Sequence, residues 1–277
     1  MTSNNKIQVH YALQTCDTKS FQIQKRFCSD SKTEVVMKCV VSFFNAVRRC
    51  SIEKPNSHHT VAIIDDHSHP DMVNFLKTCI SVYTSDNLKI EFIPLTDKTG
   101  IRASIRECYL WLQNNGKDFV YQVQDDYMFL DDAIIEMIDT WFQMHAETGT
   151  HAIMSPWNDK HSWLSQYRNR ATPRTVIVGK TRYWIQFYDC SCSWLTSHQQ
   201  FSQHWDLYET FFYLITKVTP TNGDLENKSL NYMFSQRQVL GLCPVDKSLA
   251  FHMQSELEKD PHVDWKPIWD SIDINIR

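Results

Sequence analysis

The sequence predicts an α/β fold, a three-layer α/β/α sandwich built on a mostly parallel central sheet. Short β-favouring runs alternate with amphipathic helical runs throughout residues 7–146. This alternation is typical of a parallel sheet that helices cover on both faces. With 277 residues, of which 42% are hydrophobic, the chain can bury a large core within one domain.

The first strand and the first helix have local sequence signals. Residues 7–15 alternate between apolar and polar types, which predicts a strand. Ser31 and Glu34 form a capping box, a pair of side chains that binds free backbone N–H groups where a helix begins. Apolar residues follow at helical spacing over 35–47, so we expect a helix there.

Further strands and helices follow in alternation up to residue 146. Residues 60–64 are typical of a strand covered on both faces, and Asp65-Asp66 ends this run. Pro70 then begins a helix, because proline suits the first helical position. The next expected elements are a strand at 89–94, a helix at 100–114, a strand from 119 that ends in Asp125-Asp126, and a helix from Asp131.

The pattern changes after Gly149. Residues 150–154 predict a strand and 155–174 are irregular. Residues 175–178 and 183–194 indicate further strands or a hairpin, and 199–216 indicate a helix. Because no linker composition marks this change, we treat 1–277 as a single domain with two halves, 1–149 and 150–277.

Composition excludes several classes of protein. A net charge of −4 and a pI near 6.3 argue against a non-specific nucleic-acid or membrane binder. The amino terminus has no signal-peptide pattern and no run reaches membrane-spanning length, so we expect a cytoplasmic protein. The nine cysteines are scattered, which favours reduced thiols over a disulfide framework.

Glycine is informative by its position. The chain has six glycines and the first is Gly100. A Rossmann glycine fingerprint or a Walker loop therefore cannot occur in the first βα unit. If a phosphate-bearing ligand binds, a metal ion and arginine must neutralise it instead of a glycine-rich cradle.

Two pairs of carboxylates mark the candidate site. Asp65-Asp66 and Asp125-Asp126 each end a predicted parallel strand, and parallel strands place their carboxyl ends at one edge of the sheet, where ligands bind. Adjacent acids repel each other unless a divalent cation or a shared proton relieves the repulsion. The alternative for the first pair is that Asp66 and Ser68 only cap the following helix.

The second pair favours metal binding more strongly. Asp131 and Asp132 already lie at the positive end of the next helix, so Asp125 and Asp126 are not needed there as helix caps.

These motifs resemble the nucleotide-sugar-dependent glycosyltransferases of the GT-A, Rossmann-like fold, close to the family 2 type. Ile63-Ile64-Asp65-Asp66-His67-Ser68 looks like the apolar strand of that family ending in Asp-Asp-Gly-Ser. Gln124-Asp125-Asp126 sits where its Asp-x-Asp motif falls. The run from Pro244 to His252 is similar to a late strand and histidine that often close the site. The resemblance spans about 10–255.

The resemblance implies a Mn²⁺ or Mg²⁺ ion held by Asp126 and His252. The nucleotide sugar, with a UDP-sugar first among the candidates, would be bound by five residues, namely Thr15, Asp65, Asp66, Arg102 and Asp125. Two of these roles have simpler alternatives. Arg102 can be a solvated helix charge, and His252 can be a satisfied core histidine.

The general base for transfer to a hydroxyl would be Asp224 or Glu226, in a segment that resembles the family's Glu-Asp pair at the head of a helix. The sequence departs from the family pattern at three positions. Gln124 replaces the first motif carboxylate, His67 replaces a glycine, and Asn227 stands where the base is expected. One carboxylate fewer weakens a site for a hard cation.

A basic segment, 160–182, is the candidate acceptor region. It has six Lys and Arg residues, no Asp or Glu, and interleaved aromatic residues. This pattern suits a phosphate-rich acceptor, including a modified base in DNA, and a glycan is the other acceptor class. The alternative is a solvated basic loop that closes over the donor diphosphate. The predicted acceptor-binding residues are Trp163, Arg168, Arg170, Arg182 and Trp184.

The predicted function is therefore a metal-dependent hexosyl- or pentosyltransferase. In this prediction 1–149 binds the nucleotide sugar, and 150–277 binds the acceptor and supplies the base. A sugar-phosphate nucleotidyltransferase is the first alternative, but it normally needs a glycine-rich loop and residues 1–50 contain no glycine. The second alternative is a non-catalytic module that binds carbohydrate or nucleic acid, which Gln124 and Asn227 favour.

Overall fold

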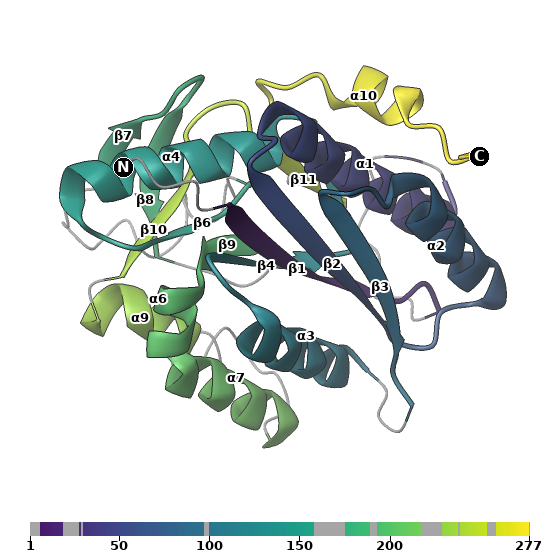
Figure 1. The fold of residues 1–277 in the computed structure, drawn as a ribbon, viewed down its shortest axis with the longest axis horizontal. Coiled ribbons are helices and arrows are strands. Elements are labelled where there is room, and N and C mark those ends of the chain that lie inside the picture. The colour runs from purple at the N-terminus through teal and green to yellow at the C-terminus, as the bar shows by residue number, and fades with distance from the viewer. Residues whose placement is uncertain are drawn as a thin grey trace.

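The structure is a computed structural model of the chain. It describes residues 6–18, 28, 30–96, 100–157, 175–188, 193–217, 229–237, 239–253 and 259–276. Within these residues the chain forms a nine-stranded sheet and a separate two-stranded sheet. Helices cover both faces of the larger sheet (Figure 1).

The first part of the chain alternates strands and helices as its sequence predicts. Its elements are β1 (Ile7–Thr15), α1 (Lys32–Glu53), β2 (Ser57–Asp65), α2 (Pro70–Tyr83), β3 (Leu88–Pro94), α3 (Ile101–Asn115), β4 (Phe119–Gln124), β5 (Tyr127–Phe129) and α4 (Ala133–Thr148). The Ser31 capping box is formed, because the Ser31 hydroxyl accepts from Glu34 N and the Glu34 carboxylate accepts from Ser31 N.

The second part has shorter strands. Its elements are β6 (Ala152–Met154), β7 (Val176–Val178), β8 (Tyr183–Phe187), β9 (Trp194–Ser197), α6 (His198–Gln203), α7 (Trp205–Lys217), α9 (Leu230–Gln236), β10 (Leu240–Pro244), β11 (Ala250–His252) and α10 (Trp265–Ser271). None of the helices in the described residues is long and apolar enough to span a bilayer.

The nine-stranded sheet has the order β3-β2-β1-β4-β9-β6-β10-β8-β7. The strands β3, β2, β1 and β4 are parallel, and β10 is parallel to β6. The strand β9 runs antiparallel to both of its neighbours, and β8 runs antiparallel to β10 and β7. The predicted α/β class is therefore confirmed, with a sheet that is mixed but largely parallel.

Alternating side chains along the central strands form two apolar layers. On one face Tyr11, Ile63 and other residues pack with α1, α2 and α4. On the opposite face Ala12 and Ile64 pack with α3, α7 and α9. Figure 1 shows these two groups of helices on opposite sides of the sheet. The strand period of two explains this division, since neighbouring residues face opposite ways.

Two expectations for the second half are refined by the structure. Strands β7 and β8 form an antiparallel hairpin, since the four residues 179–182 are too short for a parallel crossover. The helix expected at 199–216 is two helices, α6 and α7, separated at His204. The His204 N–H bonds to the carbonyls of Gln200 and Ser202, a tightened turn that ends α6.

The two-stranded sheet joins distant parts of the sequence. The strand β11 pairs antiparallel with β5, so that His252 lies opposite Tyr127. Behind this pair, Trp265 and Trp269 of α10 pack with Val35 and Met128 in a third apolar cluster. The end of the described chain therefore supports the residues that directly follow β4.

Candidate functional site

The carboxyl ends of β1 and β4 form the point where the sheet topology switches. From β1 the chain builds β2 and β3 on one side and then returns to place β4 on the other side of β1. Helices that follow strands on either side of such a point leave a crevice above the strand ends. Thr15 ends β1 and Gln124 ends β4, so this crevice is where the acidic motifs should lie.

Asp65 is bound to the end of β1. Thr15 Oγ1 donates to Asp65 Oδ1 at 2.9 Å, and Ser68 N donates to Asp65 Oδ2 at 3.1 Å. Both Thr15 and Asp65 are buried. Asp65 therefore fixes the first residues after β2 against the neighbouring strand, because each carboxylate oxygen accepts a separate hydrogen bond.

Asp66 links β2 to the start of α3. Gly100 N donates to Asp66 Oδ2 at 2.7 Å, and the His67 ring lies 3.2 Å from Asp66 Oδ1. The N-cap of α2 is His69, and the Asp66 carboxylate points to Gly100 instead. The alternative in which Asp66 only caps α2 is therefore wrong. Gly100 has a φ of 108°, a backbone conformation that suits glycine.

Asp125 is attached to the residue that follows β1. Cys16 N donates to Asp125 Oδ2 at 2.6 Å, while Lys32 Nζ donates to the Cys16 carbonyl at 2.8 Å. Burial and the neighbouring Asp126 carboxylate raise the pKa of Asp125 to about 8. A proton held by the Asp125–Asp126 pair at neutral pH would therefore relieve the repulsion between the two acids.

Asp126 meets a histidine from the far end of the chain. His252 Nε2 lies 3.2 Å from Asp126 Oδ2, and Met253 N donates to the Asp126 carbonyl at 2.8 Å. The His252 ring stacks on Tyr127 with centroids 4.6 Å apart and an interplanar angle of 10°. Stacking and strand pairing together hold the imidazole beside the carboxylate.

The Asp126–His252 pair can contribute to a shared metal site. Two ligands at neighbouring positions of an octahedral ion, each about 2.1 Å from it, lie about 3 Å apart. The 3.2 Å separation of Asp126 Oδ2 and His252 Nε2 fits this requirement. Within the described ranges no group of three or more His, Cys, Asp or Glu side chains could hold a metal ion. Asp126 and His252 could therefore supply two ligands of an ion.

The remaining predicted donor-site residue is Arg102. It lies in the first turn of α3, two positions after the Gly100 N–H that binds Asp66, and it is partly buried. Five other predicted site residues lie outside the described part of the chain. These are Trp163, Arg168, Arg170, Asp224 and Glu226.

Arg182 and Trp184, both predicted to bind an acceptor, point into the protein. Arg182 Nη2 donates to Asp132 Oδ2 at 2.8 Å, and Nη1 donates to the Lys247 carbonyl. Trp184 has no exposed surface and belongs to the core. The sequence pattern could not show that these two side chains are buried. Alternation along a strand divides residues between two faces of the sheet, but it does not tell which face packs against the core. Asp132 likewise binds Arg182 and makes no helix-capping bond with its side chain.

Three contacts at the site were not anticipated from sequence. The backbone N–H groups of Gly100 and Cys16 each bind a site carboxylate, and the Tyr127 ring supports His252. Tyr127 follows the acid pair directly, which was the available signal for it. Almost any residue type can supply a backbone N–H donor, so the sequence did not indicate these two contacts, apart from the glycine at position 100.

Comparisons with known proteins were made for the whole chain. No protein-family model matches it, and no curated protein matches it. Among solved structures, the galactosyltransferase LgtC in complex with donor and acceptor sugar analogues is similar, with a TM-score of 0.40 and 10% identity over 79% of this chain and 69% of LgtC. An active-site mutant of LgtC gives a TM-score of 0.42 and 12% identity over the same shares.

Proposed function

We propose that the protein transfers a glycosyl group from a nucleotide sugar to a hydroxyl acceptor. The observation that carries this proposal is the contact between Asp126 and His252 beside the carboxyl ends of β1 and β4. A carboxylate and an imidazole placed at a topological switch point suit an ion shared with a diphosphate. The family 2 type of GT-A enzyme remains part of this proposal, through the order of its acidic motifs.

The donor side of the site comes from the first half of the chain. Asp65 and Asp125 are anchored to Thr15 and Cys16, and they line the switch point. Asp66 is almost fully buried, and both of its oxygens have contacts within the protein. We therefore assign Asp66 a positioning role, in which it holds the start of α3 near the donor. Arg102 in that first turn would pair with phosphate.

The metal ion would be Mn²⁺ or Mg²⁺, held by Asp126 and His252. When bound, it would offset the negative charge that develops on the leaving diphosphate. The second half of the chain supplies His252, and the first half supplies Asp126, so the proposed site draws on both halves. In the prediction from sequence, 1–149 binds the nucleotide sugar and 150–277 binds the acceptor. The proposal adds that 150–277 also contributes His252 to the metal site.

The reaction breaks the bond between the anomeric carbon and a phosphate oxygen, whose electrons leave with the nucleoside diphosphate. The acceptor oxygen forms a bond to the anomeric carbon, and its proton passes to a carboxylate base. Asp224 and Glu226 remain our proposed bases. The acceptor would bind at the basic segment 160–182. Both acceptor classes, a nucleic acid and a glycan, remain part of the proposal.

A thermal-shift screen tests the proposal. UDP-, GDP- and dTDP-sugars, each with and without Mn²⁺, should include one donor that raises the Tm in a metal-dependent way, because a ligand that binds only the native state stabilises it. Asp126→Asn should abolish both this shift and donor hydrolysis. Asp131→Asn, a nearby exposed acid, is the matched control and should preserve both. No shift with any donor would refute the transferase, and a shift without hydrolysis or transfer would favour a binding module.

The acceptor class needs a separate measurement. If the basic segment 160–182 binds DNA, Arg168→Ala with Arg170→Ala should flatten the dependence of DNA affinity on salt, because fewer counterions are released. Absence of any DNA binding at low salt would leave the glycan as the acceptor class.

A further inference from the structure

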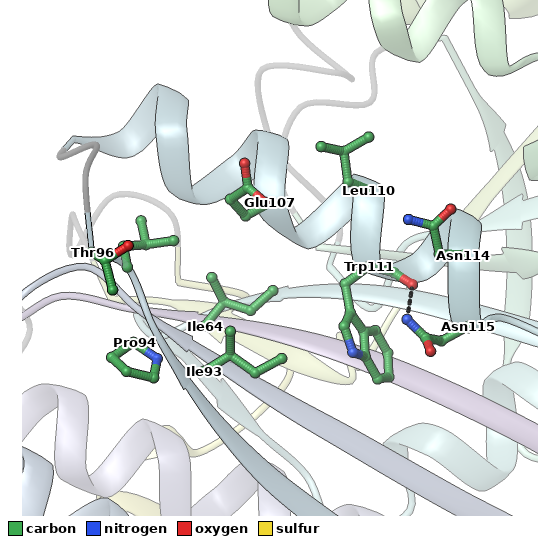
Figure 2. A pocket seen from close by; sticks show the side chains of 10 residues that line it. Ile64, Ile93, Pro94, Thr96, Glu107, Leu110, Trp111, Asn114 and Asn115 are labelled. Atoms are coloured by element: carbon green, nitrogen blue, oxygen red, sulfur yellow. Dashed lines mark hydrogen bonds between the residues drawn. The ribbon is translucent and has the colours of Figure 1, made fainter.

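A groove lies outside the candidate site, between α3 and the edge of the sheet. Its volume is about 500 Å³, within the range of small-molecule sites. The floor is formed by Ile64 of β2 and Ile93 of β3, and one side is formed by a stripe of α3 that includes Glu107, Trp111 and Asn114. In Figure 2, Ile64 and Ile93 rise from the strands toward the helix, and the Trp111 indole descends from the helix.

The groove exists because β3 is the edge strand of the sheet. No strand of the described chain pairs beyond β3, and α3 packs mainly over β1, β2 and β4, so space is left between the helix and the border strand. Along α3 the spacing of residues 107, 111 and 114 places their side chains on one face of the helix. This face lies toward β2 and β3, on the side opposite α2.

The Trp111 ring is fixed in place within this groove. Its Nε1 donates to Glu91 Oε1 at 2.8 Å, and its ring lies 6.0 Å from the His10 ring at a tilt of 46°. Asn115 Nδ2 donates to the Trp111 carbonyl at 2.9 Å, as Figure 2 shows. A side chain already held by such contacts loses little conformational freedom when a ligand packs on it.

Polar groups are spread around this apolar floor. Glu107 accepts through Oε1 from Arg106 Nη1 at 2.8 Å, and that ion pair is partly exposed. The amide groups of Asn114 and Asn115 and the hydroxyl of Thr96 also border the groove, and Asn114 is exposed. An amide both donates and accepts, and a carboxylate accepts twice, so together these groups can pair with adjacent hydroxyls.

The charge of the lining decides between ligand classes. No Lys or Arg lines the groove, and its one charged group is the Glu107 carboxylate. Arg106 already pairs with Glu107 at 2.8 Å, so the groove offers no uncompensated positive charge to a phosphate or other anion. A neutral ligand with an apolar C–H face and a hydroxyl edge matches both the indole and the polar border.

We propose that this groove binds a neutral sugar ring, a pyranoside, at a site separate from the Asp126–His252 pair. The C–H face of the sugar would pack on Trp111, while hydroxyls would bond to Glu107 and Asn114. The inference goes beyond the proposed transfer reaction and does not depend on it, because a binding module could use the same groove. In a transferase, such a site would hold a sugar unit of a longer glycan.

Calorimetry and ligand-observed NMR test the groove with defined probes: methyl β-glucopyranoside, methyl β-galactopyranoside and lactose. For so small a ligand we expect a Kd on the order of 1 mM with at least one probe. Asn114→Ala and Glu107→Gln should each weaken binding about fivefold, since each removes or weakens one hydrogen bond. Asn74→Ala, an exposed helical asparagine on α2, is the matched control and should have no effect.

Three results would overturn the proposal. The first two are that none of the three probes binds, and that binding is unaffected by Asn114→Ala and Glu107→Gln. Asp126→Asn separates this inference from the proposed function, because it should abolish donor hydrolysis and leave probe binding in the groove unchanged. Loss of probe binding in Asp126→Asn would instead place the sugar in the candidate site and refute the groove.

Discussion

His252 Nε2 lies 3.2 Å from Asp126 Oδ2, although the two residues are 126 positions apart in the sequence. The contact depends on a two-stranded sheet in which β11 runs antiparallel to β5. The Tyr127 ring, stacked on His252, fixes the imidazole plane. One short strand pair therefore brings an imidazole from the late part of the chain to the acid that follows β4.

If Asp126 and His252 bind the same ion, their contributions to metal affinity should not add. Asp126→Asn and His252→Gln should each weaken Mn²⁺ binding about tenfold or more. The double variant should bind Mn²⁺ only slightly more weakly than the weaker-binding of the two single variants. Electron paramagnetic resonance of free Mn²⁺ measures this. His262→Gln is the control, because His262 also lies beside an aspartate but is 63% exposed. Fully additive losses would contradict a shared ion.

Thr15→Val tests how Asp65 is held. Valine keeps the shape of threonine and removes the hydroxyl that donates to Asp65 Oδ1 at 2.9 Å. Because both residues are buried, the free energy of unfolding should fall by about 2 kcal/mol, the cost of an unpaired buried acceptor. Urea denaturation measures this loss. Thr78→Val on the exposed side of α2, where the hydroxyl donates to the Asn74 carbonyl, should cost less than about 0.5 kcal/mol.

Stability should fall as the pH is lowered from about 6.5 to about 4. Burial lowers the pKa of His59 to about 4, and burial with Lys117 nearby lowers the pKa of His10 to about 4. In this window the unfolded chain binds protons at His59 and His10 that the folded chain does not, so each histidine lowers the unfolding free energy by about 1.4 kcal/mol per pH unit. Asp125, whose pKa is raised to about 8 in the folded protein, acts in the opposite direction and offsets one of the two histidines. Above pH 6.5 both histidines are neutral in the folded and the unfolded chain, so their contribution to the free energy of unfolding no longer changes with pH.

The variant His59→Gln isolates this effect. Glutamine can replace the bonds of the imidazole to Tyr11 and Ser57, each 2.8 Å in the structure. Urea denaturation at several pH values should then show a smaller slope between pH 6.5 and 4 than in the wild type. The slope should change less in His58→Gln, which alters a neighbouring, partly exposed histidine whose charge is a smaller cause of the low His59 pKa than burial. A wild-type slope in His59→Gln would show that this histidine does not carry the effect.

The variant Arg182→Met tests whether Arg182 stabilises the fold through internal ion pairs and hydrogen bonds or binds the acceptor. Arg182 binds Asp132 at 2.8 Å, lies 3.9 Å from the buried Glu136, and donates to the Lys247 carbonyl. Its removal leaves Glu136 without this partner, so the unfolding free energy should drop by about 3 kcal/mol. Lys180→Met removes a largely exposed cation 3.9 Å from Asp139 and should change it by less than about 0.5 kcal/mol. Unchanged stability with impaired acceptor binding in Arg182→Met would restore the acceptor role.

Local sequence signals determined most of the first half of the fold. The strand period over 7–15, the capping box of Ser31 and Glu34, and Pro70 at a helix start each act within a few residues, and the structure confirms all three. The same signals indicated that Asp65 and Asp125 follow parallel strands and lie at one edge. Parallel pairing needs only the alternation of strand and helix, which is visible in sequence.

Only the tertiary structure decided which partners these residues meet. That Asp66 binds Gly100, that Asp126 meets His252, and that Arg182 turns inward all depend on contacts between segments far apart in the chain. Residue type and periodicity set how each segment folds, but not which segments meet. Long-range pairing and burial choose the partners, because they follow from the packing of the whole core and the register of its strands.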